Sequence, residues 1–147
     1  LPHPFMLPDL VHRNASAVLF AAAETPDVSL DVLAVDGMGQ GISRVRVRLA
    51  NAGSLPTMTY NAVQKKVARK DVVKVSGAGL TVVAGGVLTD LFKDEVSYKA
   101  QKPEWQFVHV PGNGKVDLQF LVQGSGTLEV RYESAKAGTR TKTVVVP

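Results

Sequence analysis

The side chains that could do chemistry in this sequence are few and stand apart. The chain has no cysteine, so neither a disulfide nor a thiolate site can form. Its three histidines, His3, His12 and His109, do not fall in the H-x-x-E, H-E-x-x-H or H-x-H spacings that hold zinc. No serine lies in a G-x-S-x-G elbow, and the adjacent Asp94 and Glu95 have the character of solvated loop charges. These residues predict a chain without a catalytic residue, a metal site or a cofactor of its own.

Basic side chains gather in one part of the chain, which carries a net charge of +4 overall. Arg44, Arg46 and Arg48 alternate with apolar residues, and this spacing predicts that all three face solvent from one side of a strand. The candidate basic patch comprises Arg44, Arg46, Arg48, Lys65, Lys66, Arg69 and Lys70. A patch of this kind can attract polyanions. Tyr60 is the only aromatic residue near it, so stacking on bases is not expected and no nucleic-acid partner is predicted.

The most distinctive local pattern is Asn51-Ala52-Gly53-Ser54-Leu55-Pro56-Thr57. Asn51 can hydrogen-bond the neighbouring backbone, Gly53 can adopt a positive φ, and Pro56 fixes the direction in which the chain leaves. We expect a structural corner at the end of a strand, formed by Asn51, Gly53, Leu55, Pro56 and Thr57. A binding role for this loop is the alternative.

The elements that must position these residues are mostly strands. Val45, Val47 and Leu49 alternate with the three arginines, and the segments 116–122 and 128–132 show the same period of two. Further strands are expected at 28–32, 60–67, 72–75, 80–83, 87–92, 105–109 and 143–146, separated by turn residues such as Pro111-Gly112-Asn113-Gly114. The pattern predicts an all-β protein, an immunoglobulin-like or transthyretin-like antiparallel β-sandwich.

One α-helix is expected before the strands, from Asp9 to Glu24, because the segment is rich in alanine and Thr25-Pro26 ends it. The domain prediction is a tail and helix at 1–25 and a sandwich at 26–147. Apolar residues lie on more than one side of the helix, so it should have neighbours on more than one side. The candidate interface comprises Leu10, Val11, Val18, Leu19 and Phe20.

A family resemblance rests on three stretches. The run from Ile42 through Leu49 into Asn51-Ala52-Gly53-Ser54-Leu55-Pro56-Thr57 resembles a strand and corner that follow the catalytic domain of bacterial carboxypeptidase A-like zinc peptidases. The stretch Ser134-Ala135-Lys136-Ala137-Gly138-Thr139-Arg140 is similar to an element near the end of the same module, and His3-Pro4-Phe5 is similar to its entry. The zinc ligands and general base of such peptidases have no counterpart in these residues.

The resemblance implies a non-catalytic C-terminal accessory domain that stabilises or orients a zinc carboxypeptidase domain, whose reaction is hydrolysis of C-terminal peptide bonds. Zinc would then belong only to an absent upstream catalytic domain of the same polypeptide, which would also be the partner of the helix, and the protein would be periplasmic or secreted. Self-association through the helix is a second possibility for that surface.

No apolar run approaches the roughly 20 residues of a membrane span. Two alternatives remain open: an adhesive module that binds carbohydrate or cell wall through the basic strand face, and a hydrolase whose site is assembled from distant residues.

Overall fold

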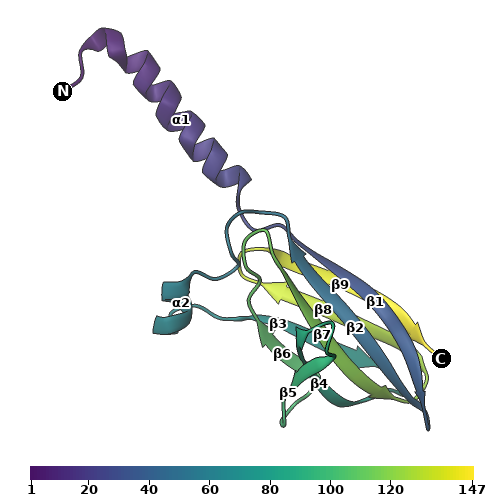
Figure 1. The fold of residues 1–147 in the computed structure, drawn as a ribbon. Helices are drawn as coiled ribbons and strands as arrows, with labels where there is room; N and C mark the ends of the chain where they lie inside the picture. Colours follow the sequence, from purple (N-terminus) through teal and green to yellow (C-terminus); the bar gives the residue numbers. More distant parts are fainter.

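The computed structural model describes all of residues 1–147 and has two antiparallel sheets packed face to face, with one long helix outside them (Figure 1). The elements, in chain order, are a 3-10 turn at Pro4–Met6, α1 (Leu7–Ala23), β1 (Val28–Gly39), β2 (Ile42–Asn51), α2 (Tyr60–Lys65), β3 (Asp71–Gly77), β4 (Thr81–Asp90), β5 (Glu95–Tyr98), β6 (Trp105–Val108), β7 (Lys115–Gln123), β8 (Gly126–Ser134) and β9 (Gly138–Val146). The predicted fold class, an all-β sandwich with one N-terminal helix, is confirmed.

The strand order is β1-β2-β7-β4-β5 in the first sheet and β6-β3-β8-β9 in the second. Short turns join β1 to β2, β4 to β5 and β8 to β9 within one sheet, while the other connections, including the short turn from β7 to β8, cross between the sheets. As a result, β1 and β9 lie side by side along one long side of the sandwich (Figure 1). The two remaining edge strands are β5 and β6, which the segment 99–104 connects.

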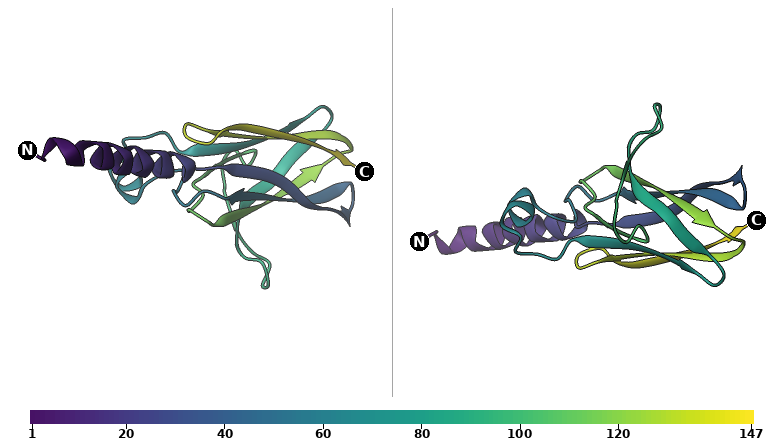
Figure 2. Two further views of the ribbon diagram at one scale, coloured as in Figure 1. Left: turned by 90° about the horizontal axis from the view of Figure 1, so that it is seen from above. Right: turned by 90° about the horizontal axis from the view of Figure 1, so that it is seen from below.

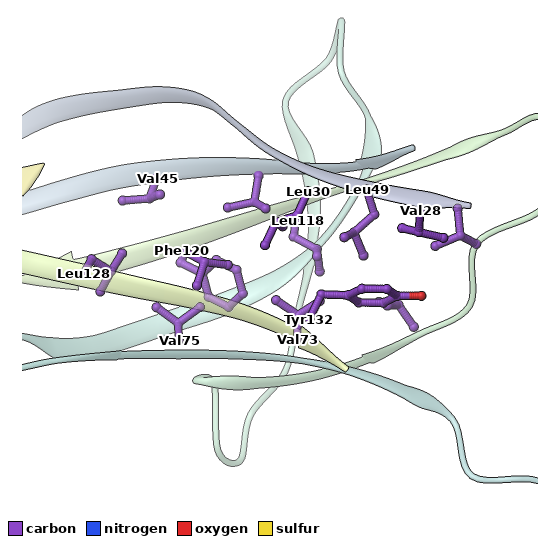
Figure 3. Close-up of a cluster of buried hydrophobic side chains, with 14 of the residues drawn as sticks. Val28, Leu30, Val45, Leu49, Val73, Val75, Leu118, Phe120, Leu128 and Tyr132 are labelled. Atoms are coloured by element: carbon purple, nitrogen blue, oxygen red, sulfur yellow. The ribbon is translucent and has the colours of Figure 1, made fainter. Parts of the chain in front are cut away.

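The core lies between the sheets and consists almost entirely of alternating aliphatic residues (Figure 3). Val45, Val47 and Leu49 are fully buried, as the alternation with arginine predicted. The expected inward row of β8 is also confirmed, with Tyr132 as its largest member. Period-two alternation places these side chains on the inner face because successive residues of a strand point to opposite sides of the sheet.

Helix α1 begins two residues before the predicted start and ends at Ala23, just ahead of Thr25-Pro26. None of its residues is buried, and it projects from one end of the sandwich (Figures 1 and 2). The helix was expected to have neighbours on more than one side, but the sandwich buries none of its residues. The helix is not long and apolar enough to cross a membrane, and the same holds for α2.

The segment 60–67, expected to be a strand, forms the short helix α2 instead. Thr59 caps it by accepting a hydrogen bond from the Ala62 amide at 3.3 Å. Lys66 then ends the helix with a positive φ of 52°. The strand prediction failed because this segment lacks alternation: Val63 and Val67 are four residues apart, which is a helical spacing.

Candidate binding surface

Strand β6 turns its aromatic residues outward and its smaller residues inward. Gln106 and Val108 are buried, whereas Trp105 is 38% exposed and Phe107 is 47% exposed. Trp105, Phe107 and His109 share the exposed face, as the period of two expected for the segment 105–109 implies. Gln106 tolerates burial because its side-chain amide donates to the Pro103 carbonyl at 2.9 Å.

Lysine ammonium groups lie over both exposed rings. The Nζ atoms of Lys74 and Lys102 are 4.8 and 5.8 Å from the ring centre of Trp105, and that of Lys99 is 4.9 Å from the ring centre of Phe107. These distances are in the range of cation–π attraction. Lys99 also donates to the Trp105 carbonyl at 3.2 Å, which fixes its position. We call Trp105, Phe107, Lys74, Lys99 and Lys102 the aromatic–lysine surface.

The positive charge continues across the outer face of the second sheet. The Glu133 carboxylate is 3.1 Å from Lys74, 2.9 Å from Arg131 and 4.0 Å from Arg69. The hydrogen bond from Lys74 and the charges of the three cations lower the pKa of Glu133 below its ordinary value. Around Glu133, therefore, three cations surround one carboxylate and leave a local excess of positive charge.

A groove runs beside β6 on the side of the sandwich away from β1 and β9. It has a volume of about 370 Å³ and is lined by Val87, Phe107, Val108, His109, Pro111, Lys115 and Val116; we call it the side groove. A second groove of about 440 Å³ shares Val87, Lys115 and Val116 with it and extends to the tip of the β4–β5 hairpin. That hairpin stands out from the sandwich (Figure 2), and Phe92 at its tip is 99% exposed.

The arginines of β2 do not form a free basic face. Arg44 contacts Asp36 at 2.8 Å, Arg46 pairs with Asp94, and Arg48 holds both oxygens of Asp117 at 2.7 and 3.0 Å. The hydrogen bond to Asp117 raises the pKa of Arg48 further above its ordinary value. The expectation of a solvated arginine stripe is wrong because each arginine faces an acidic residue from another strand or loop.

The other half of the candidate basic patch lies on α2 and the loop after it, away from the three arginines. Lys65, Lys66, Arg69 and Lys70 are all exposed. Arg69 and Lys70 border a small pocket of about 170 Å³ with Glu133, Ser134 and Ala135. The structure therefore divides the predicted patch into two groups on different elements.

The predicted corner is built around the buried side chain of Asn51. Its oxygen accepts from the amides of Asp27 and Gly53, both at 3.0 Å, and its nitrogen donates to the carbonyls of Leu55 at 2.8 Å and Pro111 at 3.2 Å. Thr57 is also buried, and its hydroxyl accepts from the Val110 amide at 2.9 Å. Leu55 and Pro56 border a pocket with Thr25 and Lys136 at the base of α1.

Gly53 does not have the predicted positive φ, so that prediction is wrong. Glycine is required for a different reason: a Cβ atom at this position would overlap the backbone carbonyl of Thr25. The close approach of two chain segments therefore selects glycine here.

Sequence reasoning missed a buried polar pair near this corner. The hydroxyl of Tyr132 donates to the Asp71 carboxylate at 2.6 Å, and Asp71 is only 2% exposed. Burial, followed by this hydrogen bond, raises the pKa of Tyr132 far above its ordinary value of 10.0. Asp71 stands at the start of a short strand, and nothing in its local sequence indicates a partner that lies 61 residues away.

The candidate interface on α1 is almost entirely free. Leu19 is 70% exposed and Phe20 is 69% exposed, and Val11 and Val18 are similarly open, while Leu10 is half-buried. The helix carries one internal ion pair, between Asp9 and Arg13 at 3.0 Å.

Comparison with solved structures gives remote likenesses. A conjugate transposon protein of Bacteroides vulgatus is 10% identical, with 82% of this chain and 83% of that chain covered and a TM-score of 0.46. A conjugative transposon lipoprotein of Bacteroides eggerthii is 8% identical, with 81% and 95% covered and a TM-score of 0.43. The GAE domain of yeast GGA1 is 10% identical, with 82% and 92% covered and a TM-score of 0.37. No curated protein matches the sequence.

The resemblance to the accessory domain of a zinc carboxypeptidase is wrong. Residues 27–145 match instead a family described as "Domain of unknown function (DUF8731)". That resemblance was the only basis for a catalytic partner, for zinc in that partner and for a parent peptidase reaction, so none of the three is supported. The alternative of an adhesive module on the basic strand face gains no support either, because the arginines of that face are paired. The family match runs from the residue before β1 to the last residue but one of β9, and the chain belongs to the DUF8731 family.

Proposed function

We propose that the sandwich is a non-catalytic binding module that takes an acidic polypeptide segment of a partner protein on its aromatic–lysine surface. The observation that supports this most strongly is the position of three ammonium groups over two half-exposed aromatic rings. The proposed binding requires neither a metal nor a cofactor.

The chemistry of the surface favours an anion over a neutral ligand. A neutral sugar stacks on the open face of an aromatic ring, but here ammonium groups lie over Trp105 and Phe107. A carboxylate can contact such an ammonium group without displacing it, because the ammonium group has three N–H donors. Lys115 and the positive charge that Glu133 leaves unneutralised extend the preference for an anion beyond the two rings.

A polypeptide fits better than a compact anion because the charged groups are spread along an apolar groove. The side groove carries Val87, Val108 and Val116 beside the aromatic–lysine surface. A ligand that alternates acidic and apolar side chains would satisfy both. Exposed aromatic residues are also enriched at protein interfaces, whereas lysine by itself is not, so the aromatic rings support a protein partner and the lysines support its acidic character.

The binding test uses Trp105, the only tryptophan of the chain, as an internal reporter. Titration with a peptide of alternating glutamate and valine should change its emission, whereas a peptide of alternating lysine and valine should not. Lys99→Ala combined with Lys102→Ala should weaken binding by about tenfold, since each exposed ion pair contributes up to about 1 kcal/mol. Lys65→Ala, on the remote helix α2, is the matched control and should bind as the wild type does.

Three results would overturn the proposal: an acidic peptide that leaves the emission unchanged, equal affinity for the lysine peptide, or a neutral oligosaccharide that binds as well as the acidic peptide. Binding should also weaken as salt is added, because the attraction between exposed charges is screened.

A further inference from the structure

The hydrogen-bond register of β6 leaves part of its outer edge free. The Val75 amide donates to the Glu104 carbonyl at 3.0 Å, and Val73 and Asp71 are the register partners of Gln106 and Val108. In an antiparallel pair, hydrogen-bonded residues alternate with residues whose backbone groups point away. The N–H and C=O groups of Trp105 and Phe107 therefore point away from β3.

The molecule satisfies these groups at Trp105 but not at Phe107. The Trp105 amide donates to the Lys102 carbonyl at 3.0 Å, and its carbonyl accepts from Lys99. Phe107 has no backbone or side-chain partner on that side, and His109, two residues further on, has none either. Two residues at a spacing of two form the repeat with which an added strand pairs.

The edges on the opposite side carry register shifts or inward-facing charges, whereas β6 carries neither. Strand β1 has two register shifts, which disrupt pairing, and β9 places Arg140 and Lys142 on the core-facing side opposite Tyr132 and Val130. Bulges and inward-pointing charges are the usual protection of edge strands. On β6 the inward residues are Gln106 and Val108, and the side groove opens directly beside them.

We infer that the acidic segment binds by strand addition: it extends along β6, pairs with the free backbone groups of Phe107 and His109, and lies in the side groove. This inference rests on the proposed function and specifies its mode. Because side chains alternate along a strand, one set would point to the lysines of the aromatic–lysine surface. The other set would point to Val87 and Val116 in the groove. The partner is therefore an extended segment in which acidic and apolar residues alternate.

The decisive comparison is between Phe107→Ala and Phe107→Pro. Both remove the ring, but only proline removes the outward N–H, and the ladder to β3 does not use that group. With the glutamate–valine peptide as probe, Phe107→Pro should bind about tenfold more weakly than Phe107→Ala. This is the effect expected when one backbone hydrogen bond, worth about 1 kcal/mol or slightly more, is lost. Trp105 emission and circular dichroism establish that both variants are folded.

A second measurement covers the case in which Phe107→Pro does not fold. Peptides with N-methylated valines or N-methylated glutamates lack alternate backbone donors, so one of the two series should lose binding to the wild type and the other should retain it. Equal binding of both series, or of the two Phe107 variants, would overturn strand addition and leave the proposed function standing. Absence of binding by the unmethylated peptide would overturn the proposed function itself.

Discussion

At position 53 the backbone of another segment of the chain leaves room only for glycine. Thr25 and Gly53 approach so closely that a methyl group at Gly53 would overlap the Thr25 carbonyl. We expect Gly53→Ala to lower the free energy of unfolding by about 1–3 kcal/mol, the usual effect of forcing an extra methyl group into packed structure. Gly37→Ala is the control, because nothing lies within 4 Å of the added Cβ and no positive φ occurs there. Urea denaturation of both variants measures the difference; equal midpoints would contradict the close-approach explanation.

Tyr132 and Asp71 are expected to make stability depend on pH in the alkaline range. The folded state holds the pKa of Tyr132 above the ordinary value of 10.0, so this group stabilises the fold fully below that pH and progressively less above it. Tyr132→Phe should cost about 1–3 kcal/mol at neutral pH, because it leaves the buried Asp71 carboxylate without this donor.

The same variant should also lose less stability than the wild type as the pH rises above 10.0. Chemical denaturation at several pH values between neutrality and the alkaline limit tests both statements. Tyr60→Phe, which alters an exposed tyrosine on α2, should change neither the stability nor its pH dependence.

Among the elements, the inward face was predicted well for strands in which only one of the two sets of alternate residues, or phases, is apolar. In β2 and β8 the alternate positions are charged, so the inward face is unambiguous. From β6 to Val110 both phases are apolar, since Val108 and Val110 compete with Trp105 and Phe107. In the structure Gln106 and Val108 are the buried residues, and the contact between Gln106 and Pro103, which depends on the preceding turn, accompanies that choice. Local alternation cannot resolve such a case.

The candidate surface could not be read from the sequence for a related reason. Lys74, Lys99 and Trp105 come from β3, the β5–β6 connection and β6, and only the strand order brings them together. Likewise, the arginines of β2 were correctly placed on an outer face, but their acidic partners come from β1, β7 and the β4–β5 hairpin. Charge patterns along one strand do not reveal which charges the neighbouring strands supply.

Helix α1 gives a test of the domain division. We propose that residues 1–25 are a tail and helix, and that residues 26–147 fold without them, since no residue of α1 is buried. Deleting residues 1–22 retains Glu24, whose carbonyl accepts from the Leu55 amide at 3.0 Å. The free energy of unfolding should then change by no more than about 0.5 kcal/mol, as for other changes of exposed residues. Thermal and urea unfolding measure this, and a large loss would show that the helix supports the sandwich.

On the scale of the whole molecule, the two long sides of the sandwich differ. On one side the edges β1 and β9 lie together, and Arg140 of β9 is 3.6 Å from Asp27, just before β1. On the other side β6 is open beside the side groove. A module that binds by strand addition needs one open edge, but a second open edge would lead to pairing between copies. The charges of β9 are therefore expected to keep the molecule from self-association.

Lys142 tests this expectation because it points toward the core side of β9 yet remains exposed. In Lys142→Val the inward row of the strand would continue the apolar pattern of Val144 and Val146, and the charge that prevents edge-to-edge pairing would be lost. We expect the variant to keep its stability within about 0.5 kcal/mol but to form dimers or larger species as its concentration rises, as measured by light scattering. Thr141→Val makes an equally apolar change on the outer face, opposite Arg131, and should stay monomeric if the wild type is. If both variants associate equally, added hydrophobicity alone is responsible; if neither does, contact with β1 rather than charge protects this edge.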